Sequence, residues 1–340
     1  MISKRETALK RPERISIWSE ALRDDKGLVL AAVQHDGAAL EYVSSRLCDD
    51  YEVVLTSVKG NGAALKWAST RLQDNYDIVY AAIKSRHYGR SGAFTPLQYA
   101  SKRLRDNKEI VEAAVSIFPN SGYAFSLASE RLRGDKSIAL RAFRHSNELY
   151  YLKYIPDSLF SSRRFVLEFF QRLSGRDIDI SCFFERMNSN FINDKEIILS
   201  AVQKSGYALK YASSELCGDR DVVMAAIHNA GRALEYASAE LRDAKDVVMA
   251  AIQNDSFSFS YASEELRDKE EILIAAINNT PSSSAWNPLK VASERLRDNK
   301  DIVMLAVQRA GMYGLLWASD RLKKDEDLLK AENMFHTGRR

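Results

Sequence analysis

The chain has 340 residues, of which 46% are hydrophobic and 28% charged, a balance typical of a folded protein and not of a disordered one. Lysine and arginine exceed aspartate and glutamate by only 3, which argues against a nucleic-acid partner held mainly through phosphate contacts. The 3 cysteines, Cys48, Cys182 and Cys217, form no CxxC motif, so neither a disulfide framework nor a zinc site is predicted.

Residues 1–21 are predicted to form a lead-in helix or cap. Charged side chains such as Lys4, Arg5 and Lys10 leave no room for the apolar core of a signal peptide. No apolar run approaches the roughly 18 residues that a membrane-spanning helix needs. We therefore expect a cytoplasmic protein without a membrane span, or one that is translocated into a host cell without a cleaved signal peptide.

A repeated motif begins at Leu22 and dominates the rest of the chain. The sequence Leu-Arg-Asp-Asp-Lys-Gly-Leu-Val-Leu-Ala-Ala-Val of residues 22–33 is matched by residues 241–252 and 296–307. An equivalent anchor residue recurs at Leu22, Leu47, Leu72, Leu104, Leu132, Leu159, Phe191, Leu216, Leu241, Leu266, Leu296 and Leu322. A period of 20 to 50 residues is the signature of a repeat array. The length of this chain therefore indicates about twelve units, and not two ordinary domains.

Each unit is predicted to contain two short helices. A residue of helix-capping type, such as Asp49, stands two positions after most anchors, and an acid, such as Glu52, follows three positions later, which resembles a capping box. The apolar run that follows could equally be a buried strand on periodicity alone, but the caps and paired alanines favour a helix. A second helix follows a glycine or asparagine and carries an apolar stripe, as at Leu40, Val43 and Leu47. We expect an all-α fold, an α-solenoid of about twelve short helix pairs with a period near 25 residues, coiled as a right-handed superhelix.

The regularity of the repeat divides the chain into regions. Regular repeats are expected in residues 22–142 and 196–330, with divergent repeats in 143–195 and a C-terminal tail in 331–340. The divergent region replaces small residues by Phe165, Phe169, Phe170, Phe183 and Phe184 and adds Arg163, Arg164 and Arg172. We interpret it as a repeat pair that has drifted while keeping its core. A bend, a partner-binding wedge and a dimer contact are the alternatives.

The recurring Leu-Arg-Asp-x-Lys-(Asp/Glu)-(Ile/Val)-Val-(Leu/Met)-Ala-Ala block, followed by x-Ala-Leu-x-Tyr-Ala-Ser-x-x-Leu, resembles one repeat family, domain of unknown function 4116. The match is good in residues 22–142 and 196–330 and poor between them. That family occurs in protists and in bacterial proteins, including effectors of intracellular bacteria. The resemblance implies a helical repeat protein in an effector context, and it implies no catalytic residues.

A row of polar residues at the end of each first helix is the stronger of two candidate binding rows. We call its members in the C-terminal block the polar row: Gln203, His228, Gln253, Asn278 and Gln308. Facing a groove, these side chains would contact a peptide backbone. Solvated residues at a helix end are the alternative interpretation.

Two further recurring positions are interpreted as structural. An aromatic residue on the second helix, which could bind peptides or RNA bases, is expected to pack between repeats instead; its members are Tyr42, Trp67, Tyr99, Tyr154, Tyr211, Tyr236, Tyr261 and Trp317. The residue before the anchor is an acid at Glu215, Glu240 and Glu265 and an arginine in most other units. We predict that it forms ion pairs between repeats; the alternative is a charged stripe that steers a partner.

Three insertions interrupt the period between the first and second helices of a unit, at residues 85–96, 118–122 and 279–288. Insertions in repeat arrays map to loops on one face, which is often the binding face. We therefore expect these loops to project from one edge and to contact the partner through Arg86, His87, Tyr88, Arg90 and Trp286. Loop drift without function is the alternative.

No catalytic motif is recognised in the sequence. The histidines show no metal-binding spacing, and the chain lacks both a glycine-rich phosphate loop and a GxSxG elbow. No catalytic residue, cofactor or metal is therefore assigned. The sequence favours a non-catalytic scaffold that binds another protein or a peptide. An enzyme-type effector with a site in the divergent region, where Cys182 lies, and an RNA-binding repeat protein are the alternatives.

Overall fold

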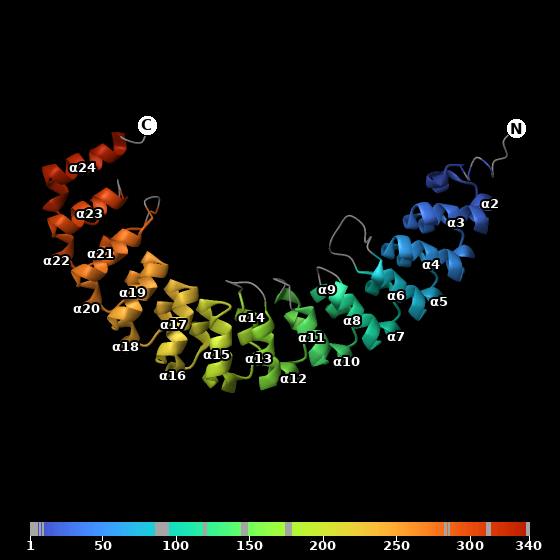
Figure 1. The fold of residues 1–340 in the computed structure, drawn as a ribbon, viewed down its shortest axis with the longest axis horizontal. Coiled ribbons are helices and arrows are strands. Elements are labelled where there is room, and N and C mark those ends of the chain that lie inside the picture. Colours follow the sequence, from blue (N-terminus) through green and yellow to red (C-terminus); the bar gives the residue numbers. More distant parts are fainter. Residues whose placement is uncertain are drawn as a thin grey trace. The chain divides into compact units, whose positions relative to one another are not determined.

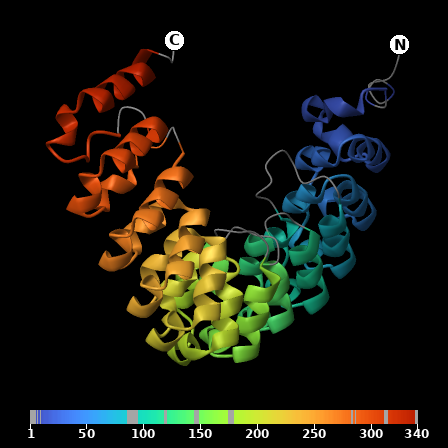
Figure 2. The same cartoon turned by 60° about the vertical axis from the view of Figure 1, so that its left-hand side comes forward.

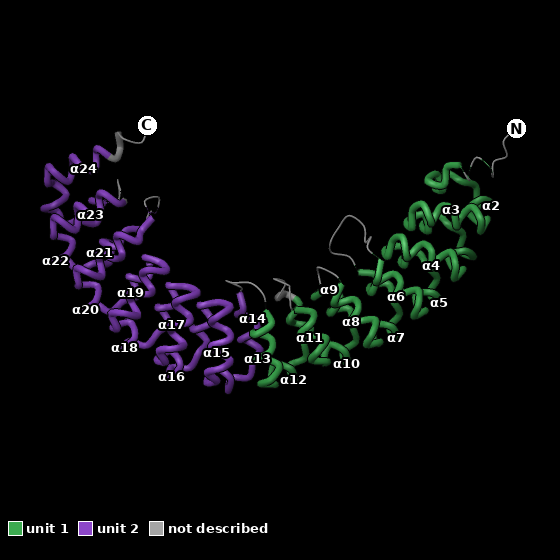
Figure 3. Tube along the Cα trace, in the orientation of Figure 1, with its two compact units in different colours: residues 1–174 green, residues 175–340 purple. Residues whose placement is uncertain are grey.

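The computed structural model describes residues 6, 8, 10–85, 95–117, 121–143, 149–173, 179–281, 284, 286–310 and 314–337. They fall into two compact units, residues 1–174 (unit 1) and 175–340 (unit 2), which Figure 3 shows in different colours. Each unit is described by itself. The described residues contain helices and no strand, so the prediction of an all-α repeat fold is confirmed. The handedness of the superhelix stays a prediction.

A long helix opens each repeat, and successive long helices pack side by side in chain order within a unit (Figures 1 and 2). Those of unit 1 are α3 (Lys26–His35), α4 (Tyr51–Gly60), α6 (Tyr76–Lys84), α8 (Lys108–Ile117), α11 (Lys136–Ala142) and α13 (Arg163–Arg172). Those of unit 2 are α15 (Lys195–Val202), α17 (Arg220–Asn229), α19 (Lys245–Asn254), α21 (Glu270–Asn279), α23 (Lys300–Ala310) and α24 (Glu326–Thr337).

The second helix predicted for each unit is divided in two by an extended residue pair. Its first part is usually a 3₁₀ helix: η1 (Pro12–Ile17), η2 (Gly37–Tyr42), η4 (Gly62–Trp67), η5 (Pro96–Tyr99), η6 (Leu149–Tyr154), η8 (Gly206–Tyr211), η9 (Gly231–Tyr236), η10 (Ser256–Tyr261) and η11 (Pro288–Val291), with α9 (Ser121–Leu127) and α14 (Ser181–Phe184) in the same place. Its second part is one short helix: α2 (Glu20–Arg23), η3 (Leu47–Asp49), α5 (Thr70–Gln73), α7 (Lys102–Arg105), α10 (Glu130–Arg133), α12 (Asp157–Phe160), η7 (Ser189–Asn193), α16 (Ser214–Cys217), α18 (Ala239–Arg242), α20 (Glu264–Arg267), α22 (Glu294–Arg297) and η13 (Leu322–Lys324).

The division has a local cause in the recurring Ala-Ser pair. Ala68 is extended, with ψ of 152°, and Ser69 caps the short helix that follows by accepting a hydrogen bond from the Leu72 backbone N–H. A serine oxygen at an N-cap position starts a new helix and so interrupts the old one. The apolar stripe through Leu40, Val43 and Leu47 therefore belongs to two short elements, and the prediction of one continuous helix was wrong in this detail.

The caps of the long helices lie one residue later than predicted. The α4 cap is Asp50, which accepts hydrogen bonds from the Glu52 and Val53 N–H groups, and the predicted cap Asp49 instead ends the short helix before it. Asp25, Asp135, Asp194 and Asp219 cap their helices in the same way. The predicted acid, as at Glu52, lies in the first helical turn, where it suits the helix dipole.

The core of each unit is a thin seam between long helices and 3₁₀ segments. Each complete repeat buries four residues of its long helix, for example Val222, Val223, Ala226 and Ile227 in α17. The small residue at the Ala226 position allows a close approach, as predicted. A Cβ added to Gly206 of η8 would lie only 2.4 Å from the Ala226 carbonyl oxygen, so a side chain there would force this backbone contact apart.

The divergent region continues the repeat architecture with a bulkier core. In α13, Phe165, Phe169 and Phe170 are buried, and Phe143 from the preceding repeat lies 6.1 Å from Phe169 between ring centroids. Glu168 on the same helix pairs with Lys136 of α11 at 2.6 Å. Large side chains thus occupy positions that small residues such as alanine hold in the regular repeats. This arrangement supports the interpretation of a drifted repeat that keeps its core.

Candidate interaction surface

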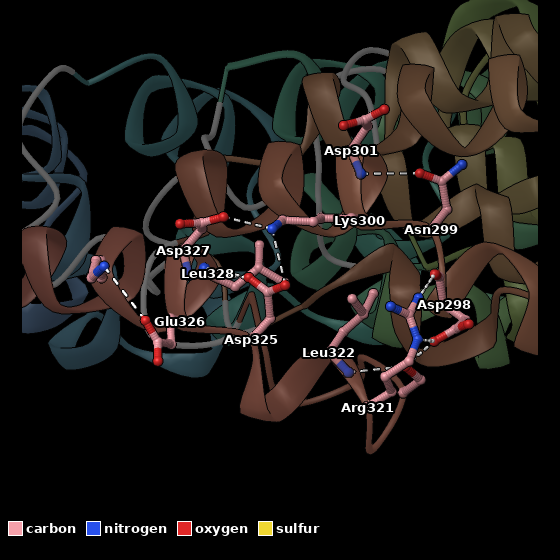
Figure 4. Close-up of polar contacts among 12 residues, drawn as sticks. Asp298, Asn299, Lys300, Asp301, Arg321, Leu322, Asp325, Glu326, Asp327 and Leu328 are labelled. Carbon is pink, nitrogen blue, oxygen red and sulfur yellow. Dashed lines mark hydrogen bonds and ion pairs between the residues drawn. The ribbon is translucent and has the colours of Figure 1, made fainter.

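The arginine before the anchor joins consecutive repeats, as the ion-pair interpretation predicts. Its guanidinium bonds the aspartate two positions after the previous anchor in the pairs Arg46–Asp24, Arg71–Asp49, Arg103–Asp74, Arg131–Asp106, Arg295–Asp268 and Arg321–Asp298. A serine of the Ala-Ser pair donates to the same carboxylate, as Ser69 does to Asp49. Figure 4 shows the last such contact, between Arg321 and Asp298. These arginines are therefore occupied by their own chain.

The hydrogen-bond donors of these contacts lower the pKa of the aspartates. The Ser69 hydroxyl, and next the Arg71 guanidinium, lower the pKa of Asp49. At Asp298 the Arg321 guanidinium is the larger cause of the lowered pKa, followed by the Ser319 hydroxyl. All these groups are well exposed, so each pair contributes little alone, and their value lies in fixing the register of neighbouring repeats.

A second set of ion pairs links the starts of successive long helices. Lys195 of α15 contacts Asp219 at 2.7 Å and Asp221 at 3.0 Å, and Lys300 of α23 contacts Asp325 and Asp327 at 3.0 and 2.6 Å (Figure 4). The Asp219 and Asp325 carboxylates also cap helices. The lysines that contact them are the largest cause of their lowered pKa. Both sets of ion pairs therefore connect neighbouring repeats.

The polar row lies at the opposite end of the long helices in unit 2. Gln203 directly follows α15, and His228, Gln253, Asn278 and Gln308 occupy the last turns of α17, α19, α21 and α23. All five side chains are exposed. The structure brings these predicted residues onto successive parallel positions, and their role in binding stays a prediction.

The asparagine after each of three polar-row members bonds a carbonyl group at the end of the preceding long helix. Among the described residues, the side chains of the row form no hydrogen bond or ion pair of their own. The Asn229 amide donates to the Val202 carbonyl oxygen at 2.9 Å, that of Asn254 to the His228 oxygen at 3.1 Å, and that of Asn279 to the Ile252 oxygen at 2.6 Å. Carbonyl groups at a helix C-terminus lack partners in their own helix. Asparagines of the next repeat supply those partners. These hydrogen bonds tie together the helix ends that carry the polar row.

The predicted loop contacts have different outcomes. Arg86, His87, Tyr88 and Arg90 lie outside the described residues. Trp286 is half-buried and not the freely exposed anchor that the sequence suggested, because its ring packs 4.5 Å from that of Phe257 in the preceding repeat. Each of the three insertions follows the end of a long helix, namely α6, α8 or α21. They thus share one position in the repeat, as predicted.

Among the recurring aromatic residues, Tyr211 packs between repeats, in agreement with the structural interpretation, whereas Tyr42 is exposed. Tyr211 stacks on Phe184 at 4.5 Å between ring centroids. In several repeats a lysine lies over one of these rings: Lys66 over Trp67, Lys153 over Tyr154, Lys210 over Tyr211 and Lys290 over Trp317, at 4.6 to 5.5 Å. In unit 2 these residues form a surface that η8, η9, η10 and η11 present in order, since these segments pack against one another.

Sequence reasoning missed the neighbours that shape this surface. Arg232 lies 4.4 Å from the Phe257 ring and binds Asp255 at 2.7 Å, and Tyr207 is 41% exposed. Tyr207, Lys210 and Asp179 line a cavity of about 340 Å³. Arg232 and Tyr207 stand at positions that vary between repeats, so periodicity gives them no signal. Only a comparison of each repeat with the consensus of the repeats could have identified these two residues.

Cys182, the residue on which the enzyme alternative depended, is half-buried in α14. Burial is the main cause that raises the pKa of its thiol, and the Asp179 carboxylate adds to it. A raised pKa keeps the thiolate, which is the nucleophilic form, scarce at neutral pH.

In the described part of the chain, no group of three histidine, cysteine, aspartate or glutamate side chains is placed to hold a metal ion. None of the described helices combines the length and apolar composition needed to cross a membrane.

The comparisons with known proteins give one match. The family model described as "Domain of unknown function (DUF4116)" matches residues 25–73, 50–95, 75–133, 194–242 and 245–285, which together cover more than half of the chain. The matched ranges leave out most of the divergent region. Neither the curated proteins nor the solved structures contain a match to this chain.

Proposed function

The chain belongs to the DUF4116 family of repeats, and from this premise we propose that it is a non-catalytic scaffold that binds another protein through the polar row of unit 2. One observation carries the proposal. Exposed side chains with hydrogen-bonding groups occur at the same place in consecutive repeats, where neighbouring asparagines already satisfy the helix ends. Within the described residues, the donors and acceptors of the row are therefore left without partners in the chain.

The chemistry of the row suits a polypeptide partner. Glutamine and asparagine amides each offer two donors and an acceptor, and a neutral histidine offers one of each. A peptide backbone presents the complementary groups at regular spacing. Interfaces of this kind gain specificity from repeated polar contacts on a helical base, because little backbone order has to be acquired on binding, although the exposed side chains still lose rotamer freedom.

A proposal for the partner and its compartment draws on the family resemblance. Since the family resemblance implies an effector context, we propose that the partner is a host-cell protein and that the chain acts in the host cytoplasm. A fusion of the chain to an enzymatic reporter that works only in host cytosol tests this point. A reporter signal in the infected host cells is expected. No signal, although the infecting bacteria express the fusion, would contradict the effector role.

Crosslinking tests the proposed binding surface directly. A photoreactive amino acid at Gln253 should capture the partner in lysate, whereas the same amino acid at Glu264, on the short-helix edge of the same unit, should not. The purified partner should then bind the variant Gln203→Ala, His228→Ala, Gln253→Ala, Asn278→Ala at least tenfold more weakly than the native chain. Equal capture from both positions, or unchanged binding by the fourfold variant, would overturn the proposal. The control variant Glu215→Gln, Glu264→Gln should bind normally.

A further inference from the structure

The cavity of about 340 Å³ in unit 2 lies where α14 meets η8. Residues 179–181 line it from the start of α14, and Ser205 and residues of η8 line it from the next repeat. The Phe184 ring of α14 stacks on the Tyr211 ring of η8 at 4.5 Å between centroids, which joins these two elements. Its volume is at the lower end of the roughly 300 to 1,000 Å³ that ligand sites occupy, so the cavity suits a small molecule.

Ser205 departs from the pattern of its position in the repeat. In other repeats the residue before the 3₁₀ helix caps that helix with its side-chain oxygen, as Asp36, Asn61 and Asp255 do. The Ser205 hydroxyl makes no such hydrogen bond, although the residue is only 5% exposed. Within the described residues this hydroxyl has no hydrogen-bond partner, and the residue lines the cavity. A hydroxyl in that position is satisfied from the cavity, by water or by a ligand.

Two opposite charges line the same cavity and form no ion pair with each other. Both hydrogen bonds from Ser181, one from its hydroxyl and one from its backbone N–H at 3.0 Å, go to Oδ1 of Asp179. They lower the pKa of Asp179, and they leave its Oδ2 without a donor in the described part of the chain. The Lys210 ammonium lies 4.6 Å over the Tyr211 ring and forms no ion pair with any described residue. A carboxylate oxygen and an ammonium group are thus both available to a ligand.

Tyr207 adds an aromatic ring that the repeat does not need for its own packing. Its side chain lines the cavity, and the residue is 41% exposed. The equivalent residues of η2 and η4 are Ala38 and Ala63, so neighbouring repeats stack without a large side chain there. An exposed aromatic ring is a favourable contact for another aromatic side chain.

We propose that this cavity binds a free α-amino acid with an aromatic side chain. The ammonium group of the ligand meets Asp179, its carboxylate accepts hydrogen bonds from Lys210 and Ser205, and its ring packs on Tyr207. Hydrogen bonds between oppositely charged groups are about twice as strong as those between neutral groups. A ligand with only one charge would leave the opposite charge of the cavity unpaired, whereas a zwitterion satisfies both.

Isothermal titration calorimetry of the full chain tests this site with three probes. They are L-phenylalanine, N-acetyl-L-phenylalanine, which lacks the ammonium group, and L-phenylalaninamide, which lacks the carboxylate. L-phenylalanine should bind saturably at one site, and each analogue should bind at least tenfold more weakly. Absence of saturable binding would overturn the proposal, and so would equal binding of either analogue. Equal binding of the amide would point instead to a site for the amino terminus of a peptide.

Two variants taken from the next repeat guard the test against a folding defect. Ser205→Ala introduces the residue that Ala230 provides before η9, and Lys210→Glu introduces the residue that Glu235 provides within η9. Both variants should therefore keep the native circular dichroism spectrum, and each should weaken binding of L-phenylalanine at least fivefold. Unchanged binding by either variant would contradict the proposed contacts.

Asp179→Asn tests the ammonium contact, because an asparagine keeps the side-chain oxygen that accepts from Ser181 and loses the charge. It should also weaken binding of L-phenylalanine at least fivefold. Lys290→Glu, the same exchange as Lys210→Glu but in η11, is the matched control and should leave binding unchanged. Unchanged binding by Asp179→Asn, or equal weakening by Lys290→Glu, would overturn the proposal. Because no protein partner is present, these outcomes are independent of the polar row.

Discussion

Arg321 donates through Nε to the Asp298 carboxylate of the preceding repeat at 3.1 Å and through Nη2 to the backbone oxygen of the same residue at 2.9 Å (Figure 4). Ser319 adds a second donor to that carboxylate. One aspartate therefore collects three hydrogen bonds from the next repeat. In a repeat array the contacts between neighbours supply most of the stability, so such local contacts set its response to pH and mutation.

Acid should weaken the array through these aspartates. The pKa of Asp298 is lowered, first by Arg321 and then by Ser319. A carboxylate with a folded-state pKa below its unfolded value, near 3.9, contributes stability that is present above about pH 4 and is lost as the pH falls through the folded-state pKa. We expect the thermal midpoint to fall as the pH decreases from about 5 to 2, and to fall less in Asp298→Asn.

Asp301 provides the matched control for that experiment, because its carboxylate forms no ion pair within the described residues. Asp301→Asn should reproduce the native acid profile in the same calorimetric series. An Asp298→Asn profile that coincides with the native one would show that the contact to Arg321 does not govern the acid response.

Gly62 should tolerate no side chain, whereas Gly60 should tolerate one. A Cβ at Gly62 would lie 2.3 Å from the Ala82 carbonyl oxygen, which is backbone and cannot move aside. At Gly60 the nearest atom lies 3.8 Å away, an ordinary contact. We expect Gly62→Ala to lower the free energy of unfolding by about 1–3 kcal/mol, the usual cost of overpacking. Gly60→Ala, at the end of α4, should be neutral or stabilising by up to about 1 kcal/mol. Urea unfolding of both variants checks the contrast.

Two buried serines should respond in opposite directions to removal of their hydroxyl groups. The Ser57 hydroxyl donates to the Gly37 oxygen at 2.6 Å, while that of Ser258 has no hydrogen-bond partner among the described residues. Ser57→Ala should cost about 1 kcal/mol in the free energy of unfolding, and Ser258→Ala should be neutral or stabilising by up to about 1 kcal/mol. Equal losses in urea titrations of the two variants would show that Ser258 has a partner in solution.

The repeat could be predicted because it is periodic, and the fine structure could not because it depends on single atoms. Anchor leucines and paired alanines identify the helices, since their spacing records which faces are buried. The serine that divides the second helix stands in the motif at Ser69, but its capping role is visible only in the hydrogen bond from Leu72. Likewise, Asp49 and Asp50 are chemically identical neighbours, and only the backbone decides that Asp50 caps α4.

The surface of unit 2 was predictable only in part. The polar row follows the repeat period, so its members could be named from the sequence. Trp286 could be named as an unusual residue, but its contact with Phe257 spans two repeats and an insertion.

The contact at Asp243 lacks its arginine, and restoring that arginine tests whether such contacts stabilise the array. Ser263 donates to Asp243, as its equivalents do in other repeats, but the arginine position holds Glu265, which pairs with Lys269 of its own chain segment. Glu265→Arg should restore the guanidinium contact and remove the like charge opposite Asp243. Since the pair is exposed, we expect a gain of only about 0.5 kcal/mol in the free energy of unfolding, measured by urea titration at low salt and reduced at high salt. Glu240→Arg faces Gly218, which offers no carboxylate, and should give no such salt-dependent gain. An equal gain in both variants would mean that relief of negative charge, and not the contact between repeats, stabilises the array.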